Sequence, residues 1–558
     1  MKKPNWNVSL ATLTASVVIA STASGDELPT LGAASPSSLE VCETLAADFD
    51  FQNTVLTEVS RVAAAEGDPE YCLVTGEMND RTGPIDGADY GSIFEMRLPT
   101  EWNGRFLYQA NGGVDGNVAD AVGRIGSPQE TGLQKGFAVI SSDAGHPTRS
   151  ASFGVDPQAR LDYGYQAVGY LTPMAKALIE AAYGRGPDRS YIGGSSNGGR
   201  HAMVAAARYG AQYDGFLALY PGVKLPRAAL YQIWGAQQWD DVATEFATPT
   251  DPDTGLATAL TGAERQVIAD AMNGQCDALD GIEDGMILNT LACQDAFSPM
   301  RDIPVCEGNR DGTCLSVAQI DILQRVFAGG QTSDGRDIYS DWYFDSGIAS
   351  QNWADWKFKY STDNRRDAVA LSYIFMTPPQ PVQPDPESTY AFSTSQDIGA
   401  ALDAIYASDE TYTESAWEFM TPPDPTNLDT IRDRGAKLLV IHGVSDPVFS
   451  AKDTAAWFEE LDAQYSGSAE ELARFFLVPG MGHGTGGPST SSYDGLDAIV
   501  AWVERGEAPD VIIAQPDARN ADVPENWSAT RSRPLCLYPA SAFYTGGDIE
   551  RAESFECR

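Results

Sequence analysis

Basic residues are scarce in this sequence. Its 558 residues include 37 Lys and Arg against 78 Asp and Glu, which gives a formal net charge of −41 at pH 7. Binding of nucleic acid or of an anionic membrane needs a basic surface, so this charge balance argues against both partners. The chain also lacks the His and Cys clusters of zinc sites and the Gly-rich loop of phosphate sites. With 43% hydrophobic residues it can nevertheless bury a large core.

The N-terminus has the layout of a secretion signal. Lys2 and Lys3 precede an apolar stretch at 10–20 and small residues at 21–25. The apolar stretch is too short to span a membrane, and no later run approaches the required length of about 18 apolar residues. We therefore predict that residues 1–25 are a signal peptide and that the protein is secreted, to the periplasm or outside the cell. The oligomeric state is not fixed by the sequence, and a monomer is the simplest expectation.

Export permits disulfide bonds, and the chain contains eight cysteines. Eight cysteines can pair in many ways, so the sequence alone does not determine the connectivity. Along the chain, however, they form four local couples. We favour a disulfide within each couple: Cys42 with Cys72, Cys276 with Cys293, Cys306 with Cys314, and Cys536 with Cys557.

From about residue 105 the sequence alternates between strand and helix patterns. Helical patterns lie at 163–183 and 198–209, which favours an α/β fold with a doubly wound sheet formed by residues 26–222 and 429–558. Residues 223–428 are rich in Trp, Asp and Pro, and we interpret them as one inserted lid domain. Short apolar runs that end in Gly, Ser or Asp, as buried parallel strands do, lie at 106–108, 137–140, 191–192, 438–441 and 475–478.

A possible nucleophile lies between one of these strands and the following helix. The segment contains Gly194, Ser196 and Gly198 in the spacing Gly-x-Ser-x-Gly. In a nucleophile elbow the glycines allow a sharp turn that presents the serine at the helix N-terminus. The motif also occurs in plain Gly/Ser-rich turns, but the strand and helix around it favour a catalytic Ser196.

A serine nucleophile needs a base, and the chain offers four histidines. His483 follows the last apolar strand in a Gly-rich loop, and Asp446 follows the strand before it. The order Ser196, Asp446, His483 is that of α/β-hydrolases, with serine as nucleophile, histidine as proton carrier and aspartate as the group that orients the imidazole. His201 lies on the elbow helix and His442 in a strand, and we interpret both as structural core residues. His146 follows another strand and could line the cleft, but it precedes the nucleophile in the chain.

An oxyanion hole requires backbone amides beside the nucleophile. The amide of Asn197, the next residue after Ser196, is one candidate. Gly112, in a Gly-rich loop after the strand at 106–108, is the second, because glycine allows a close approach to substrate. A turn without function is the alternative for Gly112.

The acidic loop at 275–287, within the predicted lid, has spacing suited to calcium. Asp277, Asp280 and Asp284 supply carboxylates, and the carbonyls of Ile282 and Met286 could complete the oxygen ligands that Ca²⁺ prefers. The spacing is not that of an EF-hand, so a solvated acidic turn is the alternative.

Together these segments resemble the tannase and feruloyl esterase family. The likeness runs from about Cys42 to Cys557. The resemblance implies an α/β-hydrolase fold, a serine carboxylesterase that uses Ser196, Asp446 and His483, a structural Ca²⁺ ion and the four local disulfides. The matching segments are Trp102-Asn-Gly-Arg-Phe106, 136–146, 190–200, 276–285 and Arg533-Pro-Leu-Cys536.

The likeness is greatest to family members that hydrolyse a terephthalate monoester. Phe449, three residues after Asp446, is the implied stacking partner of an aromatic acid. Trp356 and Phe375 are further candidates from the lid, and Arg365 or Arg366 could bind a substrate carboxylate. The implied substrate is a small aromatic-acid ester, with a terephthalate monoester ahead of hydroxycinnamate (feruloyl) or gallate esters. A non-catalytic, secreted Ca²⁺-binding protein is the alternative from another class.

The sequence departs from the family pattern beside the predicted nucleophile. Ser195 and Gly484 stand where relatives carry two cysteines that bond to each other. Such a bridge contributes about 2–4 kcal/mol of stability, so we predict a more mobile His483 loop. Asn197 also stands where the terephthalate-ester hydrolases carry an acid.

Overall fold

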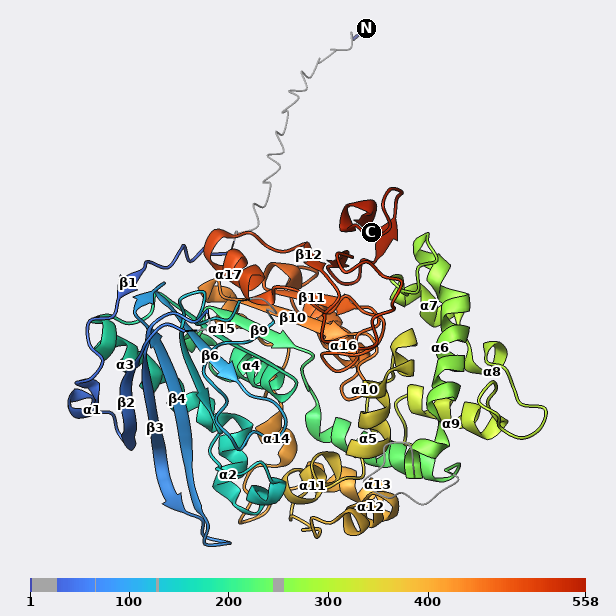
Figure 1. Cartoon of the computed structure of the whole chain (residues 1–558), viewed down its shortest axis with the longest axis horizontal. Coiled ribbons are helices and arrows are strands. Elements are labelled where there is room, and N and C mark those ends of the chain that lie inside the picture. The colour runs from blue at the N-terminus through green and yellow to red at the C-terminus, as the bar shows by residue number, and fades with distance from the viewer. Residues whose placement is uncertain (3–27, 66, 127–129, 244–254) are drawn as a thin grey trace.

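The computed structural model describes residues 1–2, 28–65, 67–126, 130–243 and 255–558 (Figure 1). The predicted signal peptide, residues 1–25, therefore lies almost wholly outside the described residues. Within those ranges, no helix combines the length and apolar character that a membrane crossing requires.

A central sheet organises one half of the molecule. Among the described residues it has nine strands: β2 (Thr54–Val62), β3 (Tyr71–Thr82), β4 (Asp89–Pro99), β6 (Arg105–Ala110), β7 (Ala138–Ser142), β8 (Arg189–Ser195), β9 (Gly215–Leu219), β10 (Lys437–Gly443) and β11 (Ala473–Val478). Their order is β11-β10-β9-β8-β6-β7-β4-β3-β2. Neighbours from β11 to β7 run parallel, and β4, β3 and β2 continue the sheet antiparallel.

The predicted strands all lie in the parallel part of this sheet. Their side chains alternate between two buried layers because successive residues of a strand point to opposite faces. Phe106 and Tyr108 face one layer, with helices α3 (Ala167–Tyr183), α4 (Asn197–Arg208) and α16 (Ala451–Gln464). Leu107 faces the other, with α17 (Gly495–Arg505). The α/β fold with helices on both faces is thus confirmed, with an antiparallel extension that was not predicted.

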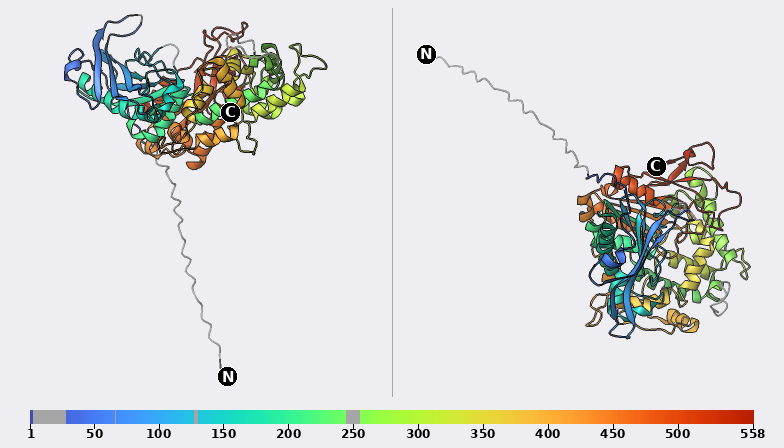
Figure 2. Two further views of the ribbon diagram at one scale, coloured as in Figure 1. Left: turned by 90° about the horizontal axis from the view of Figure 1, so that it is seen from below. Right: turned by 60° about the vertical axis from the view of Figure 1, so that its left-hand side comes forward.

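The described residues between β9 and β10 form helices and turns and add no strand to the central sheet. In Figures 1 and 2 the green and yellow helices of this segment gather beside the sheet, at the end of the molecule away from β2, whereas its last helix packs through Ile431 against the layer formed by α3, α4 and α16. The boundaries 223 and 428 stay a prediction. The larger helices of this segment are α5 (Leu225–Asp240), α6 (Gly262–Cys276), α7 (Thr290–Ala296), α9 (Val317–Phe327), α12 (Pro386–Ser395) and α13 (Ile398–Ile405), and shorter ones are α8 (Pro299–Asp302), α10 (Gln351–Ala354), α11 (Asp367–Ala370), α14 (Ala416–Met420) and α15 (Asp429–Arg434).

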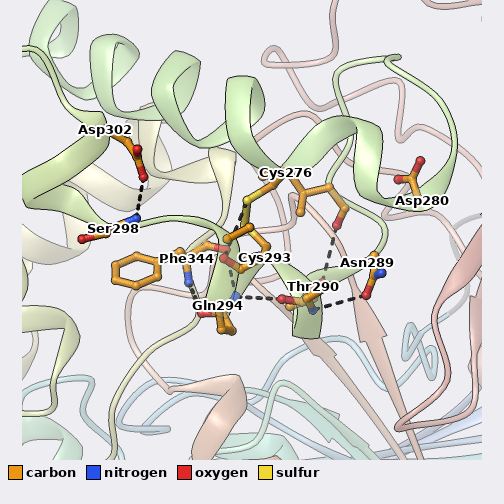
Figure 3. The surroundings of a disulfide bond; sticks show 12 residues. Cys276, Asp280, Asn289, Thr290, Cys293, Gln294, Ser298, Asp302 and Phe344 are labelled. Carbon is orange, nitrogen blue, oxygen red and sulfur yellow. Dashed lines mark hydrogen bonds between the residues drawn. A yellow bond between two sulfur atoms is a disulfide. The ribbon is translucent and has the colours of Figure 1, made fainter.

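The four predicted disulfide bonds form in the structure, so the local pairing is confirmed. The Cys276–Cys293 bond joins the end of α6 to α7 and closes the acidic loop between them (Figure 3). The Cys536–Cys557 bond joins strands β13 (Arg533–Cys536) and β15 (Phe555–Cys557) near the C-terminus.

The carboxylate of Glu504, near the end of α17, ties several segments to the sheet. Its side chain is 1% exposed and forms a bidentate pair with Arg105 of β6, with both N–O distances at 2.6 Å. The Tyr191 hydroxyl of β8 donates to it at 2.7 Å, and the Ala34 amide donates at 3.0 Å. Burial alone would raise the pKa of Glu504, but the Arg105 and Tyr191 hydrogen bonds lower it below its ordinary value.

We predict that Glu504→Ala lowers the free energy of unfolding by about 3 kcal/mol, because the substitution leaves the Arg105 guanidinium without its buried counter-charge. Glu507→Ala is the matched control, since Glu507 pairs with Arg505 at the surface with 61% of its side chain exposed; a change within about 0.5 kcal/mol is expected there. Urea unfolding followed by circular dichroism measures both. Equal losses in the two variants would contradict the structural role of Glu504.

Candidate active site

The turn between β8 and α4 places Ser196 in a strained backbone conformation. Its φ and ψ are 63° and −123°, in a region that non-glycine residues rarely occupy. A Cβ atom on Gly194 would lie 2.4 Å from the Ala110 carbonyl oxygen, and one on Gly198 would lie 2.3 Å from it. Both positions therefore require glycine, which explains the motif physically and holds Ser196 at the N-terminus of α4.

The structure brings the three predicted triad residues together. The His483 Nε2 atom lies 2.8 Å from the Ser196 Oγ atom, and the His483 Nδ1 atom lies 2.8 Å from Asp446 Oδ2. The backbone amide of His483 donates to Asn352 Oδ1 at 2.9 Å, which fixes the loop that carries the imidazole. A hydrogen-bonded chain therefore runs from a buried carboxylate through an imidazole to a serine hydroxyl.

The Asp446 carboxylate is completely buried but has several donors. The amides of Val448 and Phe449 donate to Oδ1 at 2.8 and 3.1 Å, and His442 Nε2 lies 3.3 Å from Oδ2. Burial acts to raise the pKa of Asp446, but the charges and hydrogen bonds of His483 and His442 lower it well below the ordinary value. The carboxylate is thus ionised at neutral pH, as a partner for an imidazolium must be.

The other three histidines are buried away from the serine. His442 bonds to Thr454 Oγ1 and the Phe449 carbonyl, and His201 Nε2 lies 3.0 Å from Asp115 Oδ2. His146 stacks on Phe153 with ring centroids 3.6 Å apart. Each fills a place in the core, as the sequence indicated for His201 and His442.

The predicted oxyanion residues lie beside Ser196. Gly112 packs on the elbow, since a Cβ atom there would be 3.3 Å from the Ser195 carbonyl oxygen. Asn197 begins α4, and its side chain donates to Asp115 Oδ2 at 2.9 Å and accepts from Arg200 Nε at 2.6 Å. The Asp115–Asn197 bond joins the loop after β6 to the elbow helix, so the two candidate amides are held relative to each other.

Ser196 lies between two cavities. One is largely apolar and is lined by all three predicted substrate residues, Phe449, Trp356 and Phe375. The ring centroids of Trp356 and Phe449 lie 5.0 and 5.4 Å from that of His483, edge to face. The second cavity is more polar and is lined by the loop after β6, the elbow, His483 and Trp356.

Arg366 lines both cavities with Ser196, whereas Arg365 points to solvent. The Arg365 side chain is 56% exposed and pairs with Asp363 at 2.8 Å. Arg366 has a buried Nε without a hydrogen-bond partner. Between the two sequence candidates the structure therefore places Arg366 at the cavity.

The predicted calcium loop contains three buried or nearly buried carboxylates. Asp277 accepts the amides of Asp284 and Gly285, and Asp280 accepts those of Ile282 and Leu288. Burial, together with the charges of Asp284 and Asp277, raises the pKa of Asp280 to about 7. Figure 3 shows Asp280 on the turn that follows Cys276.

The donor chemistry of this loop fits calcium, but the side chains are not gathered into a metal cluster. Asp284 Oδ1 is buried without a hydrogen-bond partner, and its other oxygen faces Arg533 and Arg531. In the described part of the chain, no three His, Cys, Asp or Glu side chains converge closely enough to hold an ion. The residues offer the hard oxygen atoms that Ca²⁺ needs, with two arginines as competing counter-charges.

The fold and these residues define an ester hydrolase of the α/β-hydrolase type, and comparison with known proteins gives the family. The model of the family described as tannase and feruloyl esterase matches residues 72–558. The chain therefore belongs to the tannase and feruloyl esterase family and is a carboxylic ester hydrolase. Membership of this enzyme family argues against the alternative of a non-catalytic Ca²⁺-binding protein.

Individual relatives cover most of the chain. Mono(2-hydroxyethyl) terephthalate hydrolase of Piscinibacter sakaiensis is 37% identical over 536 residues, which cover 89% of this chain and 86% of that protein. Feruloyl esterase B of Aspergillus niger is 27% identical over 544 residues, or 91% of this chain and 90% of that one. The crystal structure of feruloyl esterase B from Aspergillus oryzae superposes with a TM-score of 0.73 at 20% identity, covering 93% of this chain and 99% of that chain. The superposition with this crystal structure supports the α/β-hydrolase fold.

Proposed function

We propose that the protein hydrolyses esters by Ser-His-Asp chemistry through a covalent acyl-enzyme. The observation that carries the proposal is the pair of 2.8 Å contacts that join His483 to Ser196 and to Asp446. Ser196 Oγ attacks the ester carbonyl carbon while His483 Nε2 takes its proton. The imidazolium, stabilised by Asp446, then returns the proton to the departing alcohol.

Water completes the cycle in the second half of the reaction. His483 removes a proton from water, whose oxygen attacks the acyl carbon, and Ser196 leaves with the proton and frees the acid. In both halves the negative charge that develops on the carbonyl oxygen is assigned to the amides of Asn197 and Gly112. Oriented amides at a helix N-terminus stabilise such a charge without reorganising during the reaction.

We infer that the acyl group is an aromatic acid with a second carboxylate, as in a terephthalate monoester. The cavity beside Ser196 offers Phe449, Trp356 and Phe375 to an aromatic ring, and Arg366 to a carboxylate. Asp367 lines the same cavity, but burial raises its pKa to about 8, with Arg366 opposing the rise. With its pKa raised in this way, Asp367 competes less for Arg366 at neutral pH than an ordinary carboxylate would. Hydroxycinnamate and gallate esters are the alternative substrates, which the feruloyl esterase relatives support.

We also propose secretion as a monomer and one structural Ca²⁺ ion in the loop between Cys276 and Cys293. The four disulfides fit an oxidising compartment. Calcium would be held by Asp277, Asp280 and Asp284 and by the carbonyls of Ile282 and Met286. Its charge would balance three carboxylates that share one small loop.

The test of the proposed function compares the wild type with Ser196→Ala. Mono(2-hydroxyethyl) terephthalate, methyl ferulate and methyl gallate are each incubated with both proteins, and acid release is followed by chromatography. We expect terephthalate release to be fastest and to fall by at least about 10³-fold in the variant. Faster release of ferulate or gallate would support the same mechanism with a different preferred substrate. Equal rates in the two proteins would contradict a role for Ser196.

Arg366→Ala tests the carboxylate contact. We expect KM for mono(2-hydroxyethyl) terephthalate to rise by about tenfold or more, because a charge-assisted hydrogen bond contributes about 1.5–3 kcal/mol. The neutral methyl ester of the same acid lacks the charge, so its KM should not change. Arg365→Ala is the matched control, since that side chain is exposed. Equal effects of Arg366→Ala on the charged and neutral substrates would contradict this assignment.

Calcium is tested on the purified protein by elemental analysis and by thermal unfolding. We expect about one Ca²⁺ per chain, a melting temperature lowered by EDTA and restored by Ca²⁺, and no such response in Asp280→Asn, because a ligand that binds only the folded state stabilises it. Asp334→Asn, which alters an exposed acidic turn, is the control and should respond like the wild type. Wild-type protein without bound calcium and without a melting response would refute the metal site.

A further inference from the structure

Tyr220 occupies a strained position beside the proposed catalytic residues. It directly follows β9, and its φ of 36° places an aromatic residue in the left-handed region that favours glycine. Its backbone amide donates to the Ile441 carbonyl of β10 at 2.7 Å. Because this conformation costs free energy, the surrounding contacts must hold it in place.

The side chain of Tyr220 packs against the His483 loop. Its ring meets the His483 imidazole edge to face, with centroids 5.0 Å apart and planes at 70°. A Cβ atom on Gly484 would lie 2.4 Å from the Tyr220 hydroxyl oxygen, so the hydroxyl packs directly on that glycine. Burial raises the pKa of the Tyr220 hydroxyl, so it stays protonated at neutral pH.

Two other aromatic rings contact the imidazole, but they belong to other segments of the chain. Trp356 belongs to the helical segment between β9 and β10, and Phe449 follows Asp446. Tyr220 differs from both because its backbone is also tied to the elbow: the preceding residue, Leu219, pairs with Ser195 and accepts the Ser196 amide at 2.9 Å. It thereby connects the two loops whose separation sets the distance between Ser196 and His483.

We propose that Tyr220 is a positioning residue, which fixes the His483 loop against the nucleophile elbow by noncovalent contact. The inference rests on the proposed function, since it assigns to Tyr220 the control of the Ser196–His483 distance. Tyr220 does not take or give the transferred proton. Its effect is on how often His483 lies within reach of Ser196, and therefore on kcat rather than on substrate binding.

The first test is kinetic. Tyr220→Phe keeps the ring and removes the hydroxyl that packs on Gly484, and we expect kcat to fall about fivefold at unchanged KM, because the His483 loop is held less closely. Tyr220→Ala removes the ring as well, and kcat should fall by up to about 100-fold, as misplacement of a catalytic group does. Tyr465→Phe is the control, because its hydroxyl bonds to Leu428 and Asp429, and its kcat should match the wild type.

The second test is a double-mutant cycle with Gly484→Ala. The new methyl group meets the Tyr220 hydroxyl, so Gly484→Ala should lower kcat more in the wild type than in Tyr220→Ala. The backbone of Gly484 has φ of 74°, and its strain is common to both backgrounds and cancels in the comparison. Melting curves confirm that each variant is folded.

Wild-type kcat in both Tyr220 variants, a rise in KM without a fall in kcat, or additive effects in the cycle would overturn the proposal. These results differ from a failure of the proposed function. If Ser196→Ala abolishes hydrolysis while the Tyr220 variants behave as the wild type, the triad holds and only the positioning role is wrong. If Ser196→Ala is fully active, the proposed function itself fails.

Discussion

The contact between His483 Nε2 and Ser196 Oγ, two residues 287 positions apart, is the constraint on which the rest of the structure depends. It requires the loops after β8, β10 and β11 to meet at one edge of the sheet. The parallel order β11-β10-β9-β8 places the carboxyl ends of these strands side by side. Glycine at 194 and 198 then allows the elbow to approach Ala110 closely enough to aim the serine at the histidine. The fold thus supplies the geometry before any substrate binds.

The helical segment between β9 and β10 covers the active site and also helps to hold its loops in place. The buried Asp345 carboxylate accepts the Ser445 hydroxyl and the Gly480 amide, from the loops that carry Asp446 and His483. Asn352 accepts the His483 amide. The inserted segment therefore fixes two loops of the sheet at the same time that it provides the pocket wall. Substrate specificity and catalytic geometry are coupled in this arrangement, because one segment serves both.

The sequence predicted the features that depend on local patterns. The apolar runs became five parallel strands, the Gly-x-Ser-x-Gly spacing located the elbow, and cysteines near each other in the sequence paired. Strands β2 to β4 were missed because they alternate buried and exposed residues in an antiparallel sheet rather than forming apolar runs. The short strand β9 was missed too, and with it Tyr220. Arg366 could not be chosen over Arg365, because which side chain faces the cavity depends on packing between segments far apart in the chain.

Covalent labelling locates the nucleophile directly. The protein is treated with a fluorophosphonate, digested, and mapped by mass spectrometry, with His483→Ala alongside. We expect one adduct, on Ser196, and slow labelling in the variant, because the hydroxyl is activated by the imidazole. Labelling of Ser195 or of a distant serine, or equal labelling rates in the two proteins, would contradict it.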